Sequence, residues 1–239
     1  MKRKLSIVTT IILLLTSITA ISEATLIAIG KASYNGSAYN LIWDDANNGN
    51  SIVWLDYTNP ATDWSLQNSW AAGLNTSLSI NLNTGYSVDW GANSWRLPTT
   101  IDGISVEGYD GNTTTGYNIT SSEMGHLYYS IEPIGLENLG RYDRSGNLQS
   151  DFGLINTGNF NNLTAFWYWS GSEYAHSSDF AWGFNMFGGW QSTSNKSNNY
   201  LYGLAVRTGQ VSIVPEPSTI ILLSLGLIFI MGINRKIQG

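Results

Sequence analysis

The sequence predicts one α+β domain, with two main helices, short antiparallel strands and long loops, between two targeting segments. Apolar runs near both chain ends leave a body of residues 25–213, whose length is typical of a single domain. Within this body, two stretches have the apolar spacing of helices, and several short stretches after residue 156 have the composition of strands. Two helices followed by strands in one core favour α+β over a β-sandwich.

The N-terminal segment has the organisation of a secretory signal peptide over residues 1–24. Basic residues at positions 2–4 precede an apolar stretch. Small residues occupy the two positions before the expected cleavage site that a signal peptidase recognises. We therefore expect signal peptidase to cut between Ala24 and Thr25. The alternative is an uncleaved signal anchor, which the polar residues within the apolar stretch disfavour.

The C-terminal segment, residues 214–239, combines Pro215-Glu216-Pro217, an apolar run over 220–233 and a basic end. A run of this length rises about 21 Å as a helix, which is short for a hydrocarbon core of about 30 Å. The segment resembles the PEP-CTERM sorting signal. That resemblance implies a transient transmembrane helix, processing by an exosortase at the inner membrane, and delivery to the cell surface, outer envelope or extracellular matrix. The alternative is an ordinary C-terminal anchor.

The composition of the body excludes several classes of function. Six Lys and Arg stand against fifteen Asp and Glu, which gives a net charge of −9 and argues against a nucleic-acid partner. Cysteine is absent, so thiol nucleophiles, thiolate metal sites and disulfides are excluded. All ten tryptophans lie in the body. We expect no cofactor and no metal.

The first half of the body contains the two predicted helices. A strand over 52–55 ends at Asp56, and Asn59-Pro60 follows as a turn signal. A helix over 64–74 is predicted next, with Thr62 or Asp63 as its N-cap.

The second helix is predicted from a capping box over 120–123 and a stripe of apolar residues that ends before Pro133. His126 and Tyr129 lie off this stripe, so we expect them to face solvent or a rim. The stripe consists of Met124, Leu127, Tyr128 and Ile131.

The second half of the body is predicted to form strands over 166–170, 180–184 and 204–207. The middle strand alternates large and small residues, which indicates a close backbone approach on one face. A polar loop is predicted over 191–199.

Four motifs together resemble the Lcl C-terminal-like domain, also called domain of unknown function 1566. They are Trp95-Arg96-Leu97-Pro98-Thr99, the stretch from Tyr168 to Tyr174, the aromatic strand around Trp182, and Ala205-Val206-Arg207. The resemblance implies a fold like that of C-type lectins or the formylglycine-generating enzyme. It implies no general activity.

The physical chemistry of these motifs favours a structural role. Trp95 and Leu97 alternate as in a strand, and Arg96 or Arg207 could join strand ends by bidentate bonds to a carboxylate such as Glu173. The alternative is a ligand-binding arginine. The residues assigned to this structural motif are Trp95, Arg96, Leu97, Pro98, Tyr168, Trp169, Ser170, Glu173 and Arg207.

The aromatic and amide-rich second half suggests a contact surface for extracellular polysaccharide, because aromatic rings pack on the faces of sugars. The tryptophans assigned to it are Trp167, Trp169, Trp182 and Trp190. For any single tryptophan, burial in the core is the commoner role.

Catalysis and metal binding find little support in the sequence. The oxygen-rich stretch 44–50 fails the EF-hand register and is interpreted as a solvated turn, although weak calcium binding stays open. Glu132-Pro133-Ile134 lacks the amide of a lectin calcium loop. Only His126 and His176 could serve a hydrolase, and no nucleophile-elbow motif is present. We expect a non-catalytic binding module. The alternatives are a structural surface or biofilm component without a ligand, and a hydrolase of envelope glycans.

Overall fold

The computed structural model describes residues 26–214, and the two targeting segments with Ala24, Thr25 and the Pro215-Glu216-Pro217 motif lie outside the described residues. The elements are β1 (Leu26–Tyr34), β2 (Ser37–Asn47), β3 (Asn50–Thr62), α2 (Trp64–Ser77), β4 (Ser79–Leu82), β5 (Tyr86–Asp89), β6 (Glu107–Gly108), β7 (Thr115–Gly116), α3 (Glu123–Tyr129), β8 (Trp167–Glu173), β9 (Phe180–Asn185), β10 (Trp190–Asn195), β11 (Leu201–Thr208) and β12 (Gln210–Ile213).

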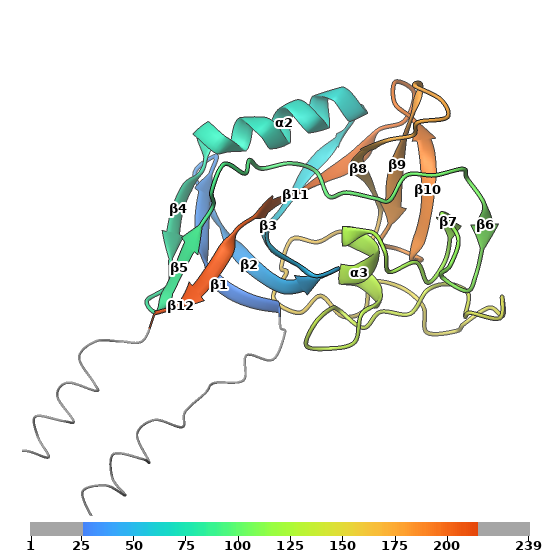
Figure 1. Cartoon of the computed structure of the whole chain (residues 1–239), viewed down its shortest axis with the longest axis horizontal. Helices are drawn as coiled ribbons and strands as arrows, with labels where there is room; N and C mark the ends of the chain where they lie inside the picture. The colour runs from blue at the N-terminus through green and yellow to red at the C-terminus, as the bar shows by residue number, and fades with distance from the viewer. Residues whose placement is uncertain (1–25, 215–239) are drawn as a thin grey trace, which may run out of the picture.

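The architecture is a mostly β fold with two helices (Figure 1). Ten strands form one sheet in the order β4-β1-β2-β3-β11-β8-β9-β10-β7-β6, and β12 pairs with β5 in a separate two-stranded ribbon. The two predicted helices are confirmed. The expectation of short strands is wrong for the first half of the fold, because β1, β2 and β3 have 9, 11 and 13 residues.

Two Asn-Gly turns build the meander of β1, β2 and β3. Asn35 and Gly36 have φ of 49° and 79°, and Asn48 and Gly49 have φ of 51° and 80°. These left-handed conformations are those of type I′ hairpin turns, for which Asn-Gly is the preferred pair. The stretch 44–50 is therefore a hairpin end, and the interpretation as a solvated turn is wrong because Asp44 and Asn47 are buried.

The predicted strand over 52–55 is part of β3, which continues through Asn59-Pro60 instead of turning there. The pairing of β3 with β11 is irregular at this point, with register shifts on both sides of Gly203. An irregular ladder tolerates proline, because no regular hydrogen bond needs its missing N–H.

Helix α2 begins as predicted, with Asp63 as the N-cap whose side chain accepts a hydrogen bond from the N–H of Leu66 at 2.9 Å. It extends to Ser77, beyond the predicted end at residue 74.

Helix α3 differs from the prediction at both ends. Its N-cap is Ser122, which accepts from Gly125 N–H, so residues 120–123 do not form a capping box. The helix ends at Tyr129, and Ile131 is 65% exposed. His126 is buried, so the expectation that it faces solvent or a rim is wrong. Tyr129 is partly exposed and lines a surface hollow, as expected of a rim residue, and its hydroxyl donates to Gly189 O at 2.6 Å.

Strands β8, β9 and β11 confirm the three strands predicted after residue 156. The predicted loop over 191–199 is wrong in its first part, because β10 occupies Trp190–Asn195 and pairs with β9 over its whole length. The predicted close approach of a neighbouring backbone to β9 occurs at Gly183. A Cβ atom added to this glycine would lie only 3.0 Å from Tyr168 O.

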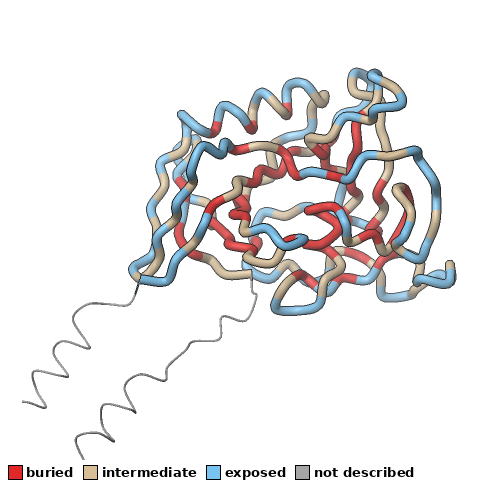
Figure 2. The backbone as a smooth tube through the Cα atoms, in the orientation of Figure 1, coloured by how far each residue is buried: buried red, intermediate tan, exposed pale blue. Residues whose placement is uncertain are grey.

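The core of the described part of the chain divides into three clusters. In Figure 2 the buried residues run along the inner strands and through α3. One cluster lies under α3 and joins Met124, Leu127 and Tyr128 to Trp54 and Phe184. Another fills the space between the long strands and α2, and a small third cluster surrounds Trp169. No helix within residues 26–214 is both long and apolar enough to cross a membrane.

Candidate functional site

The candidate site is a surface hollow of about 420 Å³ between strands β2, β3 and β11 and the loop before β8. We call it the tyrosine groove, after its three tyrosines, which come from three strands and are each partly exposed. Its lining consists of Tyr39, Tyr57, Thr58, Pro60, Asn162, Thr164 and Tyr202.

The aromatic rings of the tyrosine groove are held by other rings. Tyr57 packs edge-on against Tyr34 and Tyr39, with centroid distances of 5.2 and 4.8 Å. Tyr202, which comes from β11, packs against Phe166, whose ring is 50% exposed, at a centroid distance of 5.6 Å. Edge-on ring pairs of this kind fix the orientation of each ring. The groove therefore presents aromatic rings of fixed orientation from three strands.

A buried carboxylate fixes the polar wall of the groove. Asp56 is 1% exposed and accepts hydrogen bonds from the N–H groups of Asn161 and Asn162, both at 2.9 Å. The amide of Asn162 also donates to Asp56 O at 3.0 Å. Burial raises the pKa of Asp56, and these donors oppose the rise. Asp56 thus anchors the loop that carries Asn162 and Thr164.

Thr58 and Tyr168 complete this anchor. The hydroxyl of Thr58 donates to Asn162 O at 2.5 Å and lies 2.9 Å from the hydroxyl of Tyr168. Tyr168 in turn accepts from the N–H of Thr164 at 2.8 Å. The loop is therefore attached to β3 and β8 by a connected set of hydrogen bonds.

The hydroxyl groups of Tyr39, Tyr57 and Tyr202 form no hydrogen bond with any residue in the described range. Burial, with a further effect from Tyr34 and Tyr39, raises the pKa of Tyr57, so its phenol stays protonated at neutral pH. These hydroxyls can donate to a ligand and accept from it.

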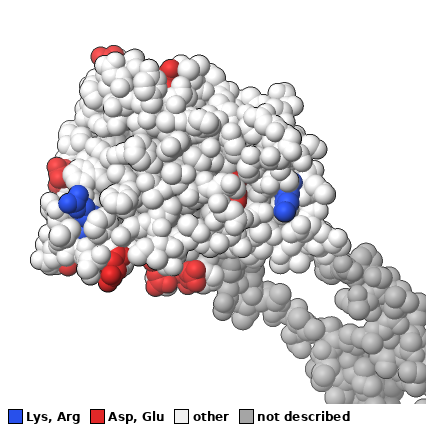
Figure 3. All heavy atoms as spheres, turned by 180° about the vertical axis from the view of Figure 1, so that it is seen from behind, with Lys and Arg blue, Asp and Glu red and all other residues white. Residues whose placement is uncertain are grey.

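The tyrosine groove is uncharged, since none of its seven lining residues is acidic or basic. Charged side chains are also sparse on the face of the molecule seen in Figure 3. A site with rings, hydroxyls and one amide but no charge suits a neutral ligand that has both an apolar face and hydroxyl groups.

The tryptophans expected to form a ligand surface do not form one. Trp169 and Trp182 are fully buried, and their indole N–H groups donate to Thr62 O and Asp102 Oδ1, at 3.0 and 2.8 Å. Trp167 and Trp190 are only partly exposed, and Trp190 packs against Tyr117. The two buried tryptophans are core residues.

The motif around Arg96 forms the predicted kind of clamp, with a different carboxylate. The guanidinium of Arg96 binds both oxygens of Glu123 at 2.7 Å, and Glu123 also accepts from Thr99 N–H at 2.7 Å. The backbone of Arg96 pairs with Val206 in both directions, at 2.9 and 3.0 Å. Arg96 therefore joins the start of α3 to β11.

Trp95 and Leu97, on either side of Arg96, are buried as their alternation predicts. The two motifs separated by seventy residues lie side by side. Ser170 is fully buried, and its hydroxyl and the N–H of Gly171 both donate to Pro98 O at 2.8 Å. Ser172 accepts from Thr100 N–H and donates to Thr100 O.

Glu173 and Arg207 take no part in the clamp. Glu173 pairs instead with Lys196 at 2.7 Å, and its side chain is 49% exposed. Arg207 lies over the ring of Trp90, 4.6 Å from its centroid, and donates to Asn93 O. Arg207 lies near the C-terminal end of β11, a strand inside the sheet, and nothing in the sequence indicated Trp90 as its partner.

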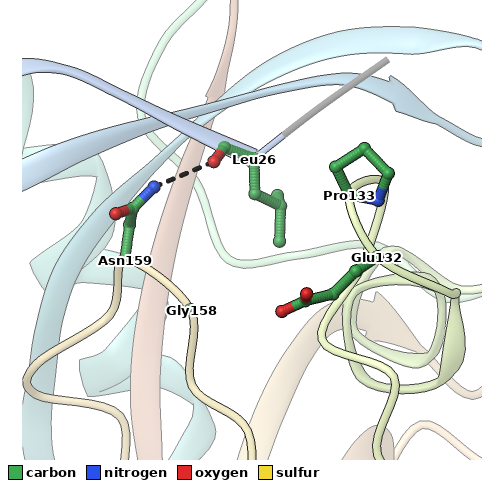
Figure 4. Close-up of a pocket in the computed structure, with 6 residues that line it drawn as sticks. Leu26, Glu132, Pro133, Gly158 and Asn159 are labelled. Carbon is green, nitrogen blue, oxygen red and sulfur yellow. Dashed lines mark hydrogen bonds between the residues drawn. The ribbon is translucent and has the colours of Figure 1, made fainter. Parts of the chain in front are cut away.

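A smaller hollow of about 180 Å³ lies where β1 begins. In Figure 4 the carboxylate of Glu132 points into the space below Leu26, and the side-chain amide of Asn159 donates to Leu26 O at 2.9 Å. A single carboxylate is a poor ligand set for a cation. No group of three or more possible metal ligands occurs within residues 26–214.

Asp44, near the end of β2, has its carboxylate occupied by hydrogen bonds within the fold. One oxygen of Asp44 accepts from Asn47 at 2.8 Å and from the indole of Trp54 at 3.0 Å. Burial raises the pKa of Asp44 to about 6, against the effect of these donors. Asp44 is thus a buried structural carboxylate that sequence reasoning missed.

Neither histidine forms the arrangement of a hydrolase within the described chain. His126 is buried, its Nδ1 lies 3.2 Å from Ser130 Oγ, and burial lowers its pKa. Its Nε2 has no partner among the described residues. His176 is exposed and packs beside the ring of Tyr174. A triad needs a carboxylate that orients the imidazole, and neither ring is hydrogen-bonded to one in residues 26–214.

Comparison with known proteins identifies the C-terminal segment. Residues 214–236 match the PEP-CTERM protein-sorting motif. This signal indicates exosortase-dependent export to the cell surface or the extracellular space. No curated protein and no solved structure matches the chain. The match does not reach the folded body, so the resemblance of that body to the Lcl C-terminal-like domain stays a prediction.

Proposed function

We propose that the protein is a non-catalytic surface module that binds a neutral polysaccharide in the tyrosine groove after export. The observation that carries the proposal is the combination of three partly exposed tyrosines, uncharged polar neighbours and no charged lining residue. A sugar ring has an apolar face that packs on an aromatic ring, and hydroxyls that bond to amides and phenols.

The charge of the body supports a neutral ligand over an acidic one. Its net charge is −9, and the groove offers no lysine or arginine to hold a carboxylate or sulfate. An anionic polysaccharide would meet repulsion from the whole domain and no local compensation.

Binding is tested by affinity electrophoresis of the folded body, residues 25–213, through gels that contain a neutral glucan, a galactomannan or polygalacturonate. We expect retardation by a neutral polymer and none by polygalacturonate. Tyr202→Ala should abolish the retardation, because it removes one of the three aromatic rings that line the groove. Tyr200→Ala is the matched control: its ring is 63% exposed and does not line the groove, so this variant should bind like the wild type.

The alternative is a structural surface component without a ligand. It would be preferred if the folded wild-type body were retarded by no polymer, including the exopolysaccharide of the producing cells. Release of new reducing ends from a retarding polymer would instead favour a glycan hydrolase.

A further inference from the structure

Val214, the last residue that the structure describes, is the first residue of the sorting segment, and it is hydrogen-bonded to the folded body. Strand β12 pairs with β5 through residue 213, and the N–H of Val214 then donates to Gly85 O at 2.8 Å. The match to the sorting motif also begins at residue 214. No spacer therefore separates the body from the segment that the sorting enzyme recognises.

This arrangement keeps the ribbon of β5 and β12 close to the membrane in the unprocessed protein. Six residue steps join Val214 to Ile220, where the apolar run begins, and they span at most about 22 Å when fully extended. Part of that length lies in the headgroup layer, which is about 5–7 Å thick on each side. In Figure 1 the described end of β12 lies at the lower left of the molecule, beside β5.

A processing enzyme acts on an extended and unpaired stretch of chain. At the C-terminal end of the body, the residues directly before the motif are paired in β12. Three of the four residues of β12, namely Gln210, Ser212 and Ile213, are already exposed, and only the half-buried Val211 packs against the core.

The opening would stop at Gly209. Its N–H donates to Ser51 O at 3.2 Å, and its carbonyl accepts from the Ser51 hydroxyl at 2.7 Å. Strand β11, before it, pairs with both β3 and β8 and contributes the buried residues 203–206. Gly209 therefore marks the boundary between β12, which can separate from the sheet, and β11, which cannot.

We propose that β12 is a release strand, which must separate from β5 before the sorting enzyme can engage the motif. Local opening of a marginal strand is a common step before proteolysis of a folded protein. The proposal does not rest on polysaccharide binding.

The test is a disulfide across the ribbon. Ser87 and Ser212 are directly opposite and both exposed, and opposed residues of an antiparallel pair have Cα atoms about 4.5–5.5 Å apart, which a disulfide can span. The chain has no cysteine, so Ser87→Cys/Ser212→Cys introduces the only two thiols. We expect the oxidised precursor, separated on a non-reducing gel, to be shortened at least about tenfold more slowly in exosortase-producing cells.

Two controls make the result specific. Ser212→Cys alone should be shortened at the wild-type rate. A flexible insert of about ten Gly and Ser residues after Val214 should restore shortening of the oxidised double variant, because the motif can then be reached without opening β12. Wild-type rates for the oxidised double variant, failure of the insert to restore shortening, or a wild-type chain that is never shortened would each overturn the proposal.

Discussion

Replacement of Arg96 by leucine tests the clamp that joins α3 to β11. The change removes both bonds to Glu123, whose side chain is 7% exposed, and leaves it with the N–H of Thr99 as its hydrogen-bond donor. Loss of one partner of a buried ion pair costs about 3–5 kcal/mol. Arg96 is 35% exposed, so water can partly replace it, and we expect a loss near the lower limit, about 3 kcal/mol. For a body of this size, that lowers Tm by about 6–12 °C.

The assay is thermal unfolding of the body followed by circular dichroism. Glu173→Gln is the matched control, because it breaks the half-exposed pair with Lys196 and should cost less than about 1 kcal/mol. The double variant Arg96→Leu/Glu123→Gln should be more stable than Arg96→Leu alone, since no buried charge is left without its partner. An unchanged Tm for Arg96→Leu, or a double variant no more stable than Arg96→Leu, would refute the reasoning.

Three further predictions follow from single residues. Asp44 has a folded-state pKa raised to about 6 from 3.8, so its protonated form stabilises the fold at low pH. This stabilisation should be lost as pH rises from about 4 to 6. Urea unfolding at several pH values should then show that the free energy of unfolding of the wild type falls by on the order of 3 kcal/mol relative to that of Asp44→Asn. Asp56→Ala should release the loop of the tyrosine groove, and affinity electrophoresis should then show weakened retardation by neutral polymers while the protein stays folded; full retention of binding would contradict this. Gly203→Ala should destabilise by about 2 kcal/mol or more, because a Cβ there would collide with the side chain of Gln67, which is held in place by its own hydrogen bonds. Gly73→Ala in α2 meets nothing within 4 Å and should raise Tm slightly.

The helices could be predicted because their signals are local. Asp63 and Ser122 are polar residues directly before apolar periodic stretches, and both are N-caps in the structure. The exact cap of α3 was mistaken because Glu123 satisfies the pattern of a capping box, yet its carboxylate is taken by Arg96, 27 residues earlier in the chain. A distant partner decided the role of that residue.

The long strands of the first half were missed although their signals are also local. Asn35-Gly36 and Asn48-Gly49 mark the two hairpins, and hydrophobic periodicity alone does not include turn chemistry. The polar strand β10 has no apolar alternation to indicate it, and only its pairing with β9 defines it.

The tyrosine groove could not be predicted from the sequence. Tyr57 and Tyr202 are 145 positions apart, and they line one hollow because β3 and β11 are neighbours in the sheet. The tryptophans gave the wrong expectation for a related reason. Trp169 and Trp182 find partners for their N–H groups inside the fold, which makes complete burial of these large rings favourable.

The most direct test of the binding account is an NMR titration of the folded body with an oligosaccharide from a neutral polymer that retards it. We predict that the chemical-shift changes concentrate on the residues of the tyrosine groove, with Tyr39, Tyr57 and Tyr202 among the largest. Changes centred on Trp167 and Trp190, with the groove signals unmoved, would contradict it.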